Sequence, residues 1–292
     1  MQASLPPSLL EALRERIAAE VDQVSYVGGG DINQARLIRS GSEQFFLKYN
    51  DLAQAAAMFA AEAKGLSLLG SNGVIAVPAV CSQGQTPDGW AFLLLEYVPS
   101  GPRDRSFWED FGRALATLHR QTAENFGLDH GNFIGSLPQS NREWPNWSGF
   151  YREERLQPQL QRALEAGLLE KADLRRFERF YRQLDELCPQ EAPALIHGDL
   201  WSGNFLSGAD RRPWLIDPAA GFAHREMDLA MSRLFGGFDW PFYRAYQEAF
   251  PTEPGLEERL PYYQLYYLLV HLNLFGKGYL GSVRDIMLSF GD

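Results

Sequence analysis

Hydrophobic and polar residues alternate along the first third of the chain in a pattern that predicts a small sheet and two helices. Leu9, Leu13 and Ile17 recur at helical spacing after two prolines, which predicts an amphipathic first helix. Short strand-like runs are expected at residues 23–28, 34–40, 44–49, 78–81 and 90–98, and an alanine-rich helix is expected over residues 52–69. These runs together predict a five-stranded antiparallel sheet with a helix packed on it.

The remaining two thirds of the chain have a mainly helical pattern. Helices are expected at about residues 104–119, 147–166 and 171–188, and the intervening segment 125–147, rich in Gly, Asn and Pro, is expected to be irregular. A Pro/Gly stretch at residues 99–102 is typical of a hinge. The sequence therefore predicts an α+β protein with two lobes, residues 1–98 and a larger, mainly helical lobe of residues 99–292.

The segment from Leu195 to Asn204 carries the residues with the clearest chemistry. Its Asp199 and Asn204 have the D-x-x-x-x-N spacing of the kinase catalytic loop, and a second apolar strand then ends at Asp217. In such a loop Asp199 accepts the proton of an acceptor hydroxyl, while Asn204 and Asp217 hold Mg²⁺. The alternative is an Asp/Asn/Gly-rich surface turn, which these residues favour for backbone reasons. The His-Gly before Asp199 and the strand before Asp217 favour phosphoryl transfer.

A glycine-rich loop between the first two strands is a candidate nucleotide-phosphate site. Gly28, Gly29 and Gly30 would let backbone N–H groups approach phosphate oxygens, and Asn33 follows in the same loop. The third glycine of G-x-G-x-x-G and the lysine of a Walker A motif are both absent. The alternative is an ordinary hairpin turn.

Lys48 lies in the third strand-like run, and Glu62 lies among apolar residues of the following helix. In kinases, a strand lysine that contacts the nucleotide phosphates pairs with a helix glutamate. The alternative is an exposed lysine and a solvated glutamate, the commoner state of both residue types. At the end of the fifth strand, the backbone of Glu96, Tyr97 and Val98 is expected to face the adenine. These positions predict ATP binding by the first lobe.

Charge and cysteine content exclude several classes of protein. The net charge of −10 argues against a nucleic-acid partner. Cys81 and Cys188 are too few for a disulfide framework, and both are expected to be buried thiols. The chain shows no secretory signal and no run long enough for a membrane span, so a cytoplasmic protein is expected. Oligomeric state is left open.

Several longer strings resemble the fructosamine (ketosamine) 3-kinase family, which has a protein-kinase-like fold related to aminoglycoside phosphotransferases. The matching strings are Gly28 to Asn33, Asn132 to Gly135, Pro138-Gln139, Trp147 with Phe150-Tyr151 and Arg155-Leu156, His197 to Asn204, Asp217 to Ala219, His224 to Glu226, Asp228 to Met231 and Leu234 to Phe238. The tryptophan in His-Gly-Asp-Leu-Trp-Ser-Gly-Asn distinguishes this family from aminoglycoside and choline kinases.

The resemblance implies ATP- and Mg²⁺-dependent phosphorylation of the 3-hydroxyl of a ketosamine, a sugar adduct on an amine. The 3-phosphate makes the adduct labile, so the reaction implies deglycation. Trp201 and His224 are candidate substrate contacts, although packing is an equal alternative for Trp201. Asp228 is expected to anchor the catalytic loop backbone, and Arg225 and Glu226 to form an internal ion pair.

Two other functions stay open at this point. One is another small-molecule kinase of the same fold, acting on an aminoglycoside, choline or homoserine. The other is a catalytically silent nucleotide-binding regulator, which the complete set of charged residues disfavours. The sequence leaves open which sugar is preferred and whether the amine is free or protein-borne.

Overall fold

The computed structural model describes residues 5–28 and 32–288. The chain folds into two compact units. The first contains residues up to Pro102 together with Leu206–Asp217, and the second contains Arg103–Phe205 together with the chain from Pro218 onward. The predicted lobe boundary between residues 98 and 99 stays a prediction.

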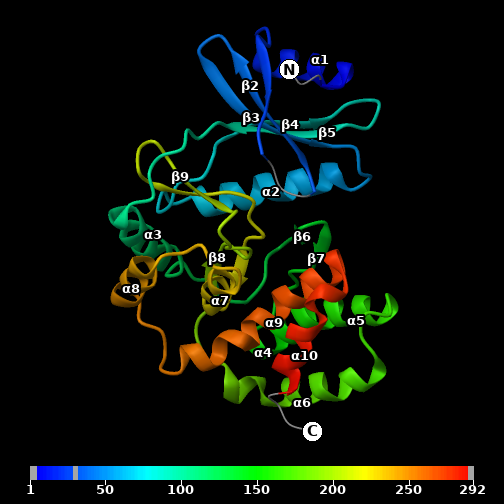
Figure 1. Ribbon diagram of the computed structural model, residues 1–292, viewed down its shortest axis with the longest axis vertical. Helices are drawn as coiled ribbons and strands as arrows, with labels where there is room; N and C mark the ends of the chain where they lie inside the picture. The colour runs from blue at the N-terminus through cyan, green and yellow to red at the C-terminus, as the bar shows by residue number, and fades with distance from the viewer. Residues whose placement is uncertain (1–4, 29–31, 289–292) are drawn as a thin grey trace. The chain divides into compact units, whose positions relative to one another are not determined.

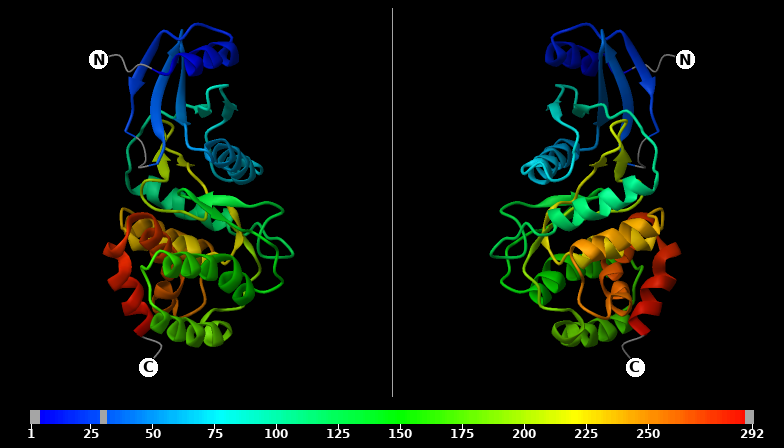
Figure 2. Two further views of the ribbon diagram at one scale, coloured as in Figure 1. Left: turned by 90° about the vertical axis from the view of Figure 1, so that its right-hand side faces the viewer. Right: turned by 90° about the vertical axis from the view of Figure 1, so that its left-hand side faces the viewer.

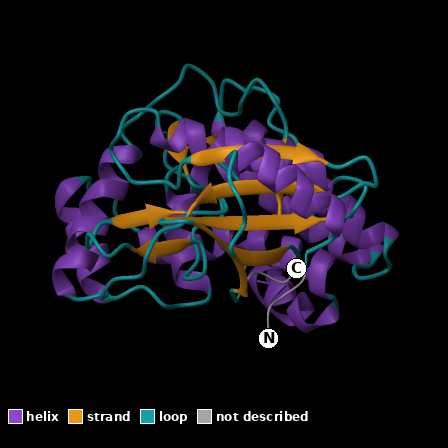
Figure 3. Ribbon diagram, turned by 90° about the horizontal axis from the view of Figure 1, so that it is seen from above, coloured by secondary structure: helices purple, strands orange, loops and turns teal. Residues whose placement is uncertain are grey.

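The first unit is built on a five-stranded antiparallel sheet, as expected (Figures 1 and 3). Its order is β1-β2-β3-β5-β4, and every neighbouring pair is antiparallel. The strands are β1 (Gln23–Tyr26), β2 (Gln34–Ser40), β3 (Glu43–Asn50), β4 (Val80–Gln85) and β5 (Ala91–Glu96). Strand β5 is an interior strand between β3 and β4.

Helices on the first unit bury both faces of β5. Phe92 and Leu94 lie in one cluster with Leu9 and Leu13 of α1 (Pro7–Ile17). Leu93 and its neighbours on the other face lie in a second cluster with residues of α2 (Ala55–Gly70). Successive strand side chains point to opposite faces, so a strand covered on both sides must be apolar throughout. This burial explains the nearly continuous apolar run of β5.

The second unit is mainly helical. Its helices are α3 (Arg105–Leu118), α4 (Trp147–Phe150), the π-helix η1 (Tyr151–Leu156), α5 (Gln157–Glu165), α6 (Lys171–Leu187), α7 (Glu226–Leu234), α8 (Trp240–Ala249), α9 (Leu256–Phe275), the 3₁₀ turn η2 (Lys277–Tyr279) and α10 (Leu280–Leu288). Helix α9 packs against α5, α7 and α10, and α3 packs against α8. Figure 2 shows α10, in red, along the outer edge of this helical unit. None of the described helices is long and apolar enough to cross a membrane.

Short strands complete the fold. Strand β8 (Ala194–Ile196) pairs with β11 (Gly221–Ala223), and β9 (Phe205–Ser207) pairs with β10 (Pro213–Leu215). The segment 125–147, expected to be irregular, contains a hairpin of β6 (Asn132–Ile134) and β7 (Leu137–Gln139). Strands of three residues, one of them containing Pro138, are too short to give a periodic signal.

Two predictions about side chains are wrong. Cys188 is buried as expected, but Cys81 on β4 is exposed.

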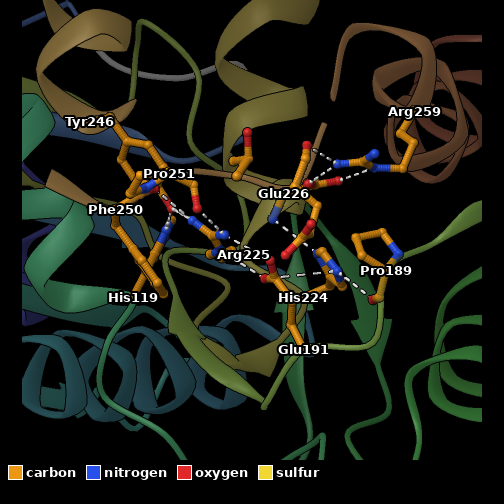
Figure 4. A network of polar contacts seen from close by, with 12 residues as sticks. His119, Pro189, Glu191, His224, Arg225, Glu226, Tyr246, Phe250, Pro251 and Arg259 are labelled. Carbon is orange, nitrogen blue, oxygen red and sulfur yellow. Dashed lines mark hydrogen bonds and ion pairs between the residues drawn. The ribbon is translucent and has the colours of Figure 1, made fainter. Parts of the chain in front are cut away.

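Arg225 and Glu226 do not pair with each other, because consecutive residues at a helix start do not face one another. Arg225 donates to both carboxylate oxygens of Glu191 at 2.7 Å, and Arg259 holds Glu226 at 2.6 and 2.9 Å (Figure 4). The first turn of α7 is thus tied to two distant segments.

The Glu226–Arg259 pair generates a stability prediction. Glu226 has no exposed surface, so Glu226→Ala leaves a largely buried guanidinium without its carboxylate. We expect the free energy of unfolding to fall by about 3–5 kcal/mol, measured by urea denaturation. The matched control is Glu257→Ala, whose exposed carboxylate pairs with Arg233 at 3.0 Å and should cost about 0–1 kcal/mol. Equal losses in both variants would contradict this interpretation.

Candidate active site

The loop between β8 and β9 is held by the carboxylate of Asp228. The backbone N–H of His197 donates to one oxygen of Asp228 at 2.7 Å, and that of Gly198 donates to the other at 2.9 Å. Asp228 lies in the first half of α7 and is fully buried. Charge-assisted hydrogen bonds of this length are strong in a buried setting. The predicted anchoring role of Asp228 is confirmed.

His119, at the end of α3, forms a further hydrogen bond with Asp228. Its Nε2 lies 3.2 Å from Asp228, and its Nδ1 lies 2.8 Å from the hydroxyl of Tyr246 on α8. An ionised carboxylate only accepts, so Nε2 carries the hydrogen and Nδ1 accepts from the tyrosine. Figure 4 shows His119 beside Tyr246, with Arg225 next in the same polar network. His119 thus connects Asp228 on α7 with Tyr246 on α8.

Asp199 and Asn204 lie together in the loop. The side-chain amide of Asn204 donates to the backbone carbonyl of Asp199 at 2.9 Å and to its carboxylate at 3.1 Å. Burial raises the pKa of Asp199 to about 7, and the charge of Asp228 acts in the same direction, whereas the hydrogen bond from Asn204 lowers it. A carboxylate with a pKa near neutral pH is suited to accept a proton from a hydroxyl.

Gly198 is required by the shape of the loop. Its φ is +83°, and a Cβ built there would lie 2.1 Å from the carbonyl oxygen of Ala219. The backbone N–H of Ala219 donates to the carbonyl of His197 at 3.0 Å, so this close approach is part of the structure. The hydroxyl of Tyr267 on α9 donates to the carbonyl of Gly198 at 3.1 Å. Both backbone groups of Gly198 are therefore fixed.

In the first unit, Lys48 lies between two carboxylates. Its ammonium donates to Glu62 of α2 at 2.8 Å and forms an ion pair with Asp217. The side chains of Lys48 and Glu62 are only 10% and 12% exposed, so the alternative of two solvated charges is excluded. Asp217 has a φ of +54°, a left-handed conformation that is uncommon for a residue with a side chain. Such conformations cluster at functional sites.

The other predicted nucleotide residues have varied surroundings. Gly28 has open space where a Cβ would be, and Gly29 and Gly30 lie outside the described residues. The side-chain oxygen of Asn33 accepts from Asn50 at 3.0 Å. Glu96 uses its carboxylate to accept from the backbone of Ala79, and Tyr97 and Val98 follow it. The nucleotide contacts of all these residues stay predictions.

The two candidate substrate residues differ. The Trp201 side chain folds over Gly203, where a Cβ would lie 2.3 Å from the ring, and Trp201 is 38% exposed. The stacking contact of Trp201 with the sugar stays a prediction. His224 has no exposed surface, and its ring nitrogens bond to the carbonyl of Pro189 and the N–H of Glu226. The predicted substrate contact of His224 is therefore corrected to a structural role, since its polar atoms are already occupied inside the fold.

Helix α9 contributes residues that the sequence pattern did not single out. Tyr266 and Tyr267 are both buried. In the structure, Tyr267 also bonds to the catalytic loop, and Tyr266 donates to Gln139 of the β6–β7 hairpin. Helical spacing places a tyrosine on the core side of a helix, but it gives no sign of which polar group its hydroxyl meets.

Comparisons with known proteins agree with this geometry. Residues 8–290 match the family model described as fructosamine kinase. A protein of Lactiplantibacillus plantarum described as a probable ketoamine kinase is 42% identical over 277 residues, which cover 93% of this chain and 95% of that protein. These matches extend over both units.

Solved structures show the same fold. A candidate fructosamine-3-kinase from Thermobifida fusca has a TM-score of 0.85 and 36% identity, covering 97% of this chain and 98% of that one. An aminoglycoside phosphotransferase bound to ADP and hygromycin B has a TM-score of 0.65 at 16% identity, with coverage of 98% and 99%. The second likeness shows the fold alone. The predicted α+β, protein-kinase-like fold class is confirmed.

The close approach at Gly198 gives a testable expectation. Gly198→Ala should strain a left-handed backbone by about 1–3 kcal/mol and push the loop away from Ala219, so stability and turnover should both fall. Thermal unfolding and steady-state kinetics measure the two effects. In the control Gly281→Ala, on α10, a Cβ meets nothing within 4 Å, and the variant should be at least as stable as the parent. A fully active Gly198→Ala variant would show that the loop tolerates a side chain here.

Proposed function

The chain belongs to the fructosamine kinase family, and we propose that it phosphorylates the 3-hydroxyl of a ketosamine with ATP as donor. The acceptors proposed are fructosamines and ribulosamines, sugar adducts on an amine. The observation that carries this proposal is the Asp199–Asn204 pair, in a loop that the family match spans. Phosphorylation at this position makes the adduct labile and releases the amine.

Asp199 is the proposed general base. Its partly buried carboxylate, with a pKa of about 7, accepts the proton of the sugar hydroxyl as that oxygen attacks the γ-phosphorus and ADP leaves. Asn204 donates to the carboxylate through its amide nitrogen, so its amide oxygen is the atom that would bind Mg²⁺. Asp228 keeps the backbone of the loop in place, so the base does not have to be repositioned during the reaction.

Lys48 is the proposed contact for the α- and β-phosphates. Glu62 fixes its ammonium at 2.8 Å, which orients a flexible side chain before the nucleotide binds. Asn204 and Asp217 offer an amide oxygen and a carboxylate, the hard oxygen donors that suit Mg²⁺. When bound, Mg²⁺ would neutralise charge on the phosphates. Backbone groups of Gly28 to Gly30 and of Glu96 to Val98, together with Asn33, complete the proposed nucleotide site, and Trp201 would stack on the sugar.

An acceptor screen tests this function against its two rivals. ADP release is measured with Mg-ATP and fructosyl-lysine or ribulosyl-lysine, in comparison with unmodified lysine, choline and an aminoglycoside. Turnover confined to the two ketosamines is expected and would also rank the sugars. Turnover of choline or the aminoglycoside instead would indicate another small-molecule kinase. Nucleotide binding without turnover of any acceptor would indicate a silent regulator.

The role of Asp199 predicts the behaviour of Asp199→Asn. The amide retains the shape of the carboxylate but cannot accept the proton, so kcat should fall by about 10²- to 10⁴-fold while nucleotide affinity is retained. Steady-state kinetics and nucleotide titration measure the two quantities. Asp110→Asn, an exposed carboxylate on α3, is the control and should leave both unchanged. Undiminished kcat in Asp199→Asn would remove this residue from the mechanism.

The role of Lys48 predicts a different kinetic change. Lys48→Met removes a charge-assisted contact worth about 1.5–3 kcal/mol, so kcat/KM for ATP should fall by roughly 10- to 150-fold. The control is Lys64→Met, an exposed lysine on the same helix as Glu62, which should have no effect. Circular dichroism verifies that both variants are folded. An ATP dependence equal to that of the parent would exclude Lys48 from the nucleotide site.

A further inference from the structure

Four aromatic side chains form a partly exposed surface on the second unit, here called the aromatic surface: Phe235, His271, Phe275 and Tyr279. Phe235 is 41% exposed and Phe275 is 52% exposed. The ring centroid of His271 lies 4.7 Å from Phe235, 5.5 Å from Phe275 and 5.1 Å from Tyr279. Single exposed apolar residues are ordinary, but contiguous exposed rings indicate a binding surface.

The aromatic surface adjoins the catalytic loop along helix α9. Tyr267 bonds to the carbonyl of Gly198, and one turn later the Nδ1 of His271 lies 2.8 Å from the carbonyl of Tyr267. Phe275 follows after another turn. At 1.5 Å per residue, the eight residues from Tyr267 to Phe275 span about 12 Å. His271 and Phe275 of the aromatic surface therefore lie one and two helical turns beyond the residue of α9 that bonds to the catalytic loop.

A second connection runs through the segment after α7. Phe235 is followed by two glycines, and a Cβ on Gly237 would lie 2.4 Å from the Cβ of Ser202 in the catalytic loop. The segment that carries Phe235 is therefore packed on that loop. Trp201, the neighbour of Ser202, is itself 38% exposed. Exposed rings thus lie on the catalytic loop and on two of the segments that contact it.

None of the four side chains is a carboxylate, a guanidinium or an ammonium group. Nδ1 of His271 donates to a backbone carbonyl, and burial lowers the pKa of this histidine, so the ring is neutral. Neutral ring faces attract methylene groups and cations, as in the recognition of alkylated lysines by aromatic cages. The net charge of −10 also favours an approaching cation. The surface is therefore complementary to the amine side of a ketosamine rather than to its sugar.

We propose that the aromatic surface binds the lysyl side chain that bears the sugar, together with the neighbouring residues of its polypeptide. This inference rests on the proposed function. In an extended ribulosyl-lysine, nine bonds separate the 3-oxygen from the lysine Cα, a reach of roughly 11 Å. That reach is comparable to the two turns of α9 between Tyr267, which bonds to the catalytic loop, and the exposed Phe275. With the 3-hydroxyl at Asp199, the polypeptide backbone would lie over the exposed rings.

The test compares two acceptors that differ only on the amine side. One is a peptide carrying ribulosyl-lysine, and the other is the ribulosyl adduct of methylamine, which is too short to reach the surface. In the variant Phe235→Ala/Phe275→Ala, the KM for the peptide should rise at least fivefold, since each stacked ring contributes about 0.5–1.5 kcal/mol. The kcat with either acceptor and the KM for the methylamine adduct should not change.

Two further variants exclude simpler explanations. Trp240→Ala removes a more exposed ring from α8, outside the aromatic surface, and should leave both KM values unchanged. Phe275→Leu keeps apolar bulk and should raise the peptide KM by less than the double variant does. Unchanged kinetics with the methylamine adduct show that the active site is intact in each variant.

The outcomes separate this inference from the proposed function. A peptide KM unaffected by the double variant, or a KM raised equally for both acceptors, would overturn the role of the aromatic surface while ketosamine turnover stands. If the unmodified protein turns over neither acceptor, the proposed function fails and this inference fails with it.

Discussion

The carboxylate of Asp228 is the interaction on which the catalytic loop depends. It receives two consecutive backbone N–H groups, those of His197 and Gly198, and the ring of His119 from the opposite side. A buried carboxylate without partners would be costly, so the donors and the acceptor stabilise one another. With the loop backbone fixed, Gly198 must adopt its left-handed conformation, and Asp199 and Asn204 are presented together.

Polar contacts beyond Asp228 join several elements of the second unit. Tyr246 connects His119 to Arg225 by hydrogen bonds. Arg225 in turn forms an ion pair with Glu191, in the segment before β8. Arg225 also donates to the carbonyls of Phe250 and Pro251 after α8 (Figure 4). The catalytic loop is thus supported by α3, α7 and α8 together. This arrangement holds a proposed base of near-neutral pKa in a fixed position, as efficient proton transfer requires.

The sequence predicted features whose signal is local. The alternation of hydrophobic and polar residues correctly predicted the five strands of the sheet. The apolar neighbours of Glu62 in the sequence correctly indicated that it pairs with Lys48. Predictions failed where a partner lies far away in the chain. Arg225 and Glu226 pair with Glu191 and Arg259, and His224 bonds to Pro189. A polar residue in a motif shows that hydrogen bonds are needed, but only the fold decides which groups supply them.

The position of the transferred phosphate is the most direct measurement of the proposed chemistry. Ribulosyl-lysine is incubated with Mg-ATP and the protein, and the product is analysed by mass spectrometry and by ³¹P–¹H coupling in NMR spectra. We expect a single added phosphate, coupled to the proton on carbon 3, with one ADP formed for each product molecule. Phosphate on another hydroxyl, or release of ADP with inorganic phosphate and an unmodified sugar, would contradict the assignment of a ketosamine 3-kinase.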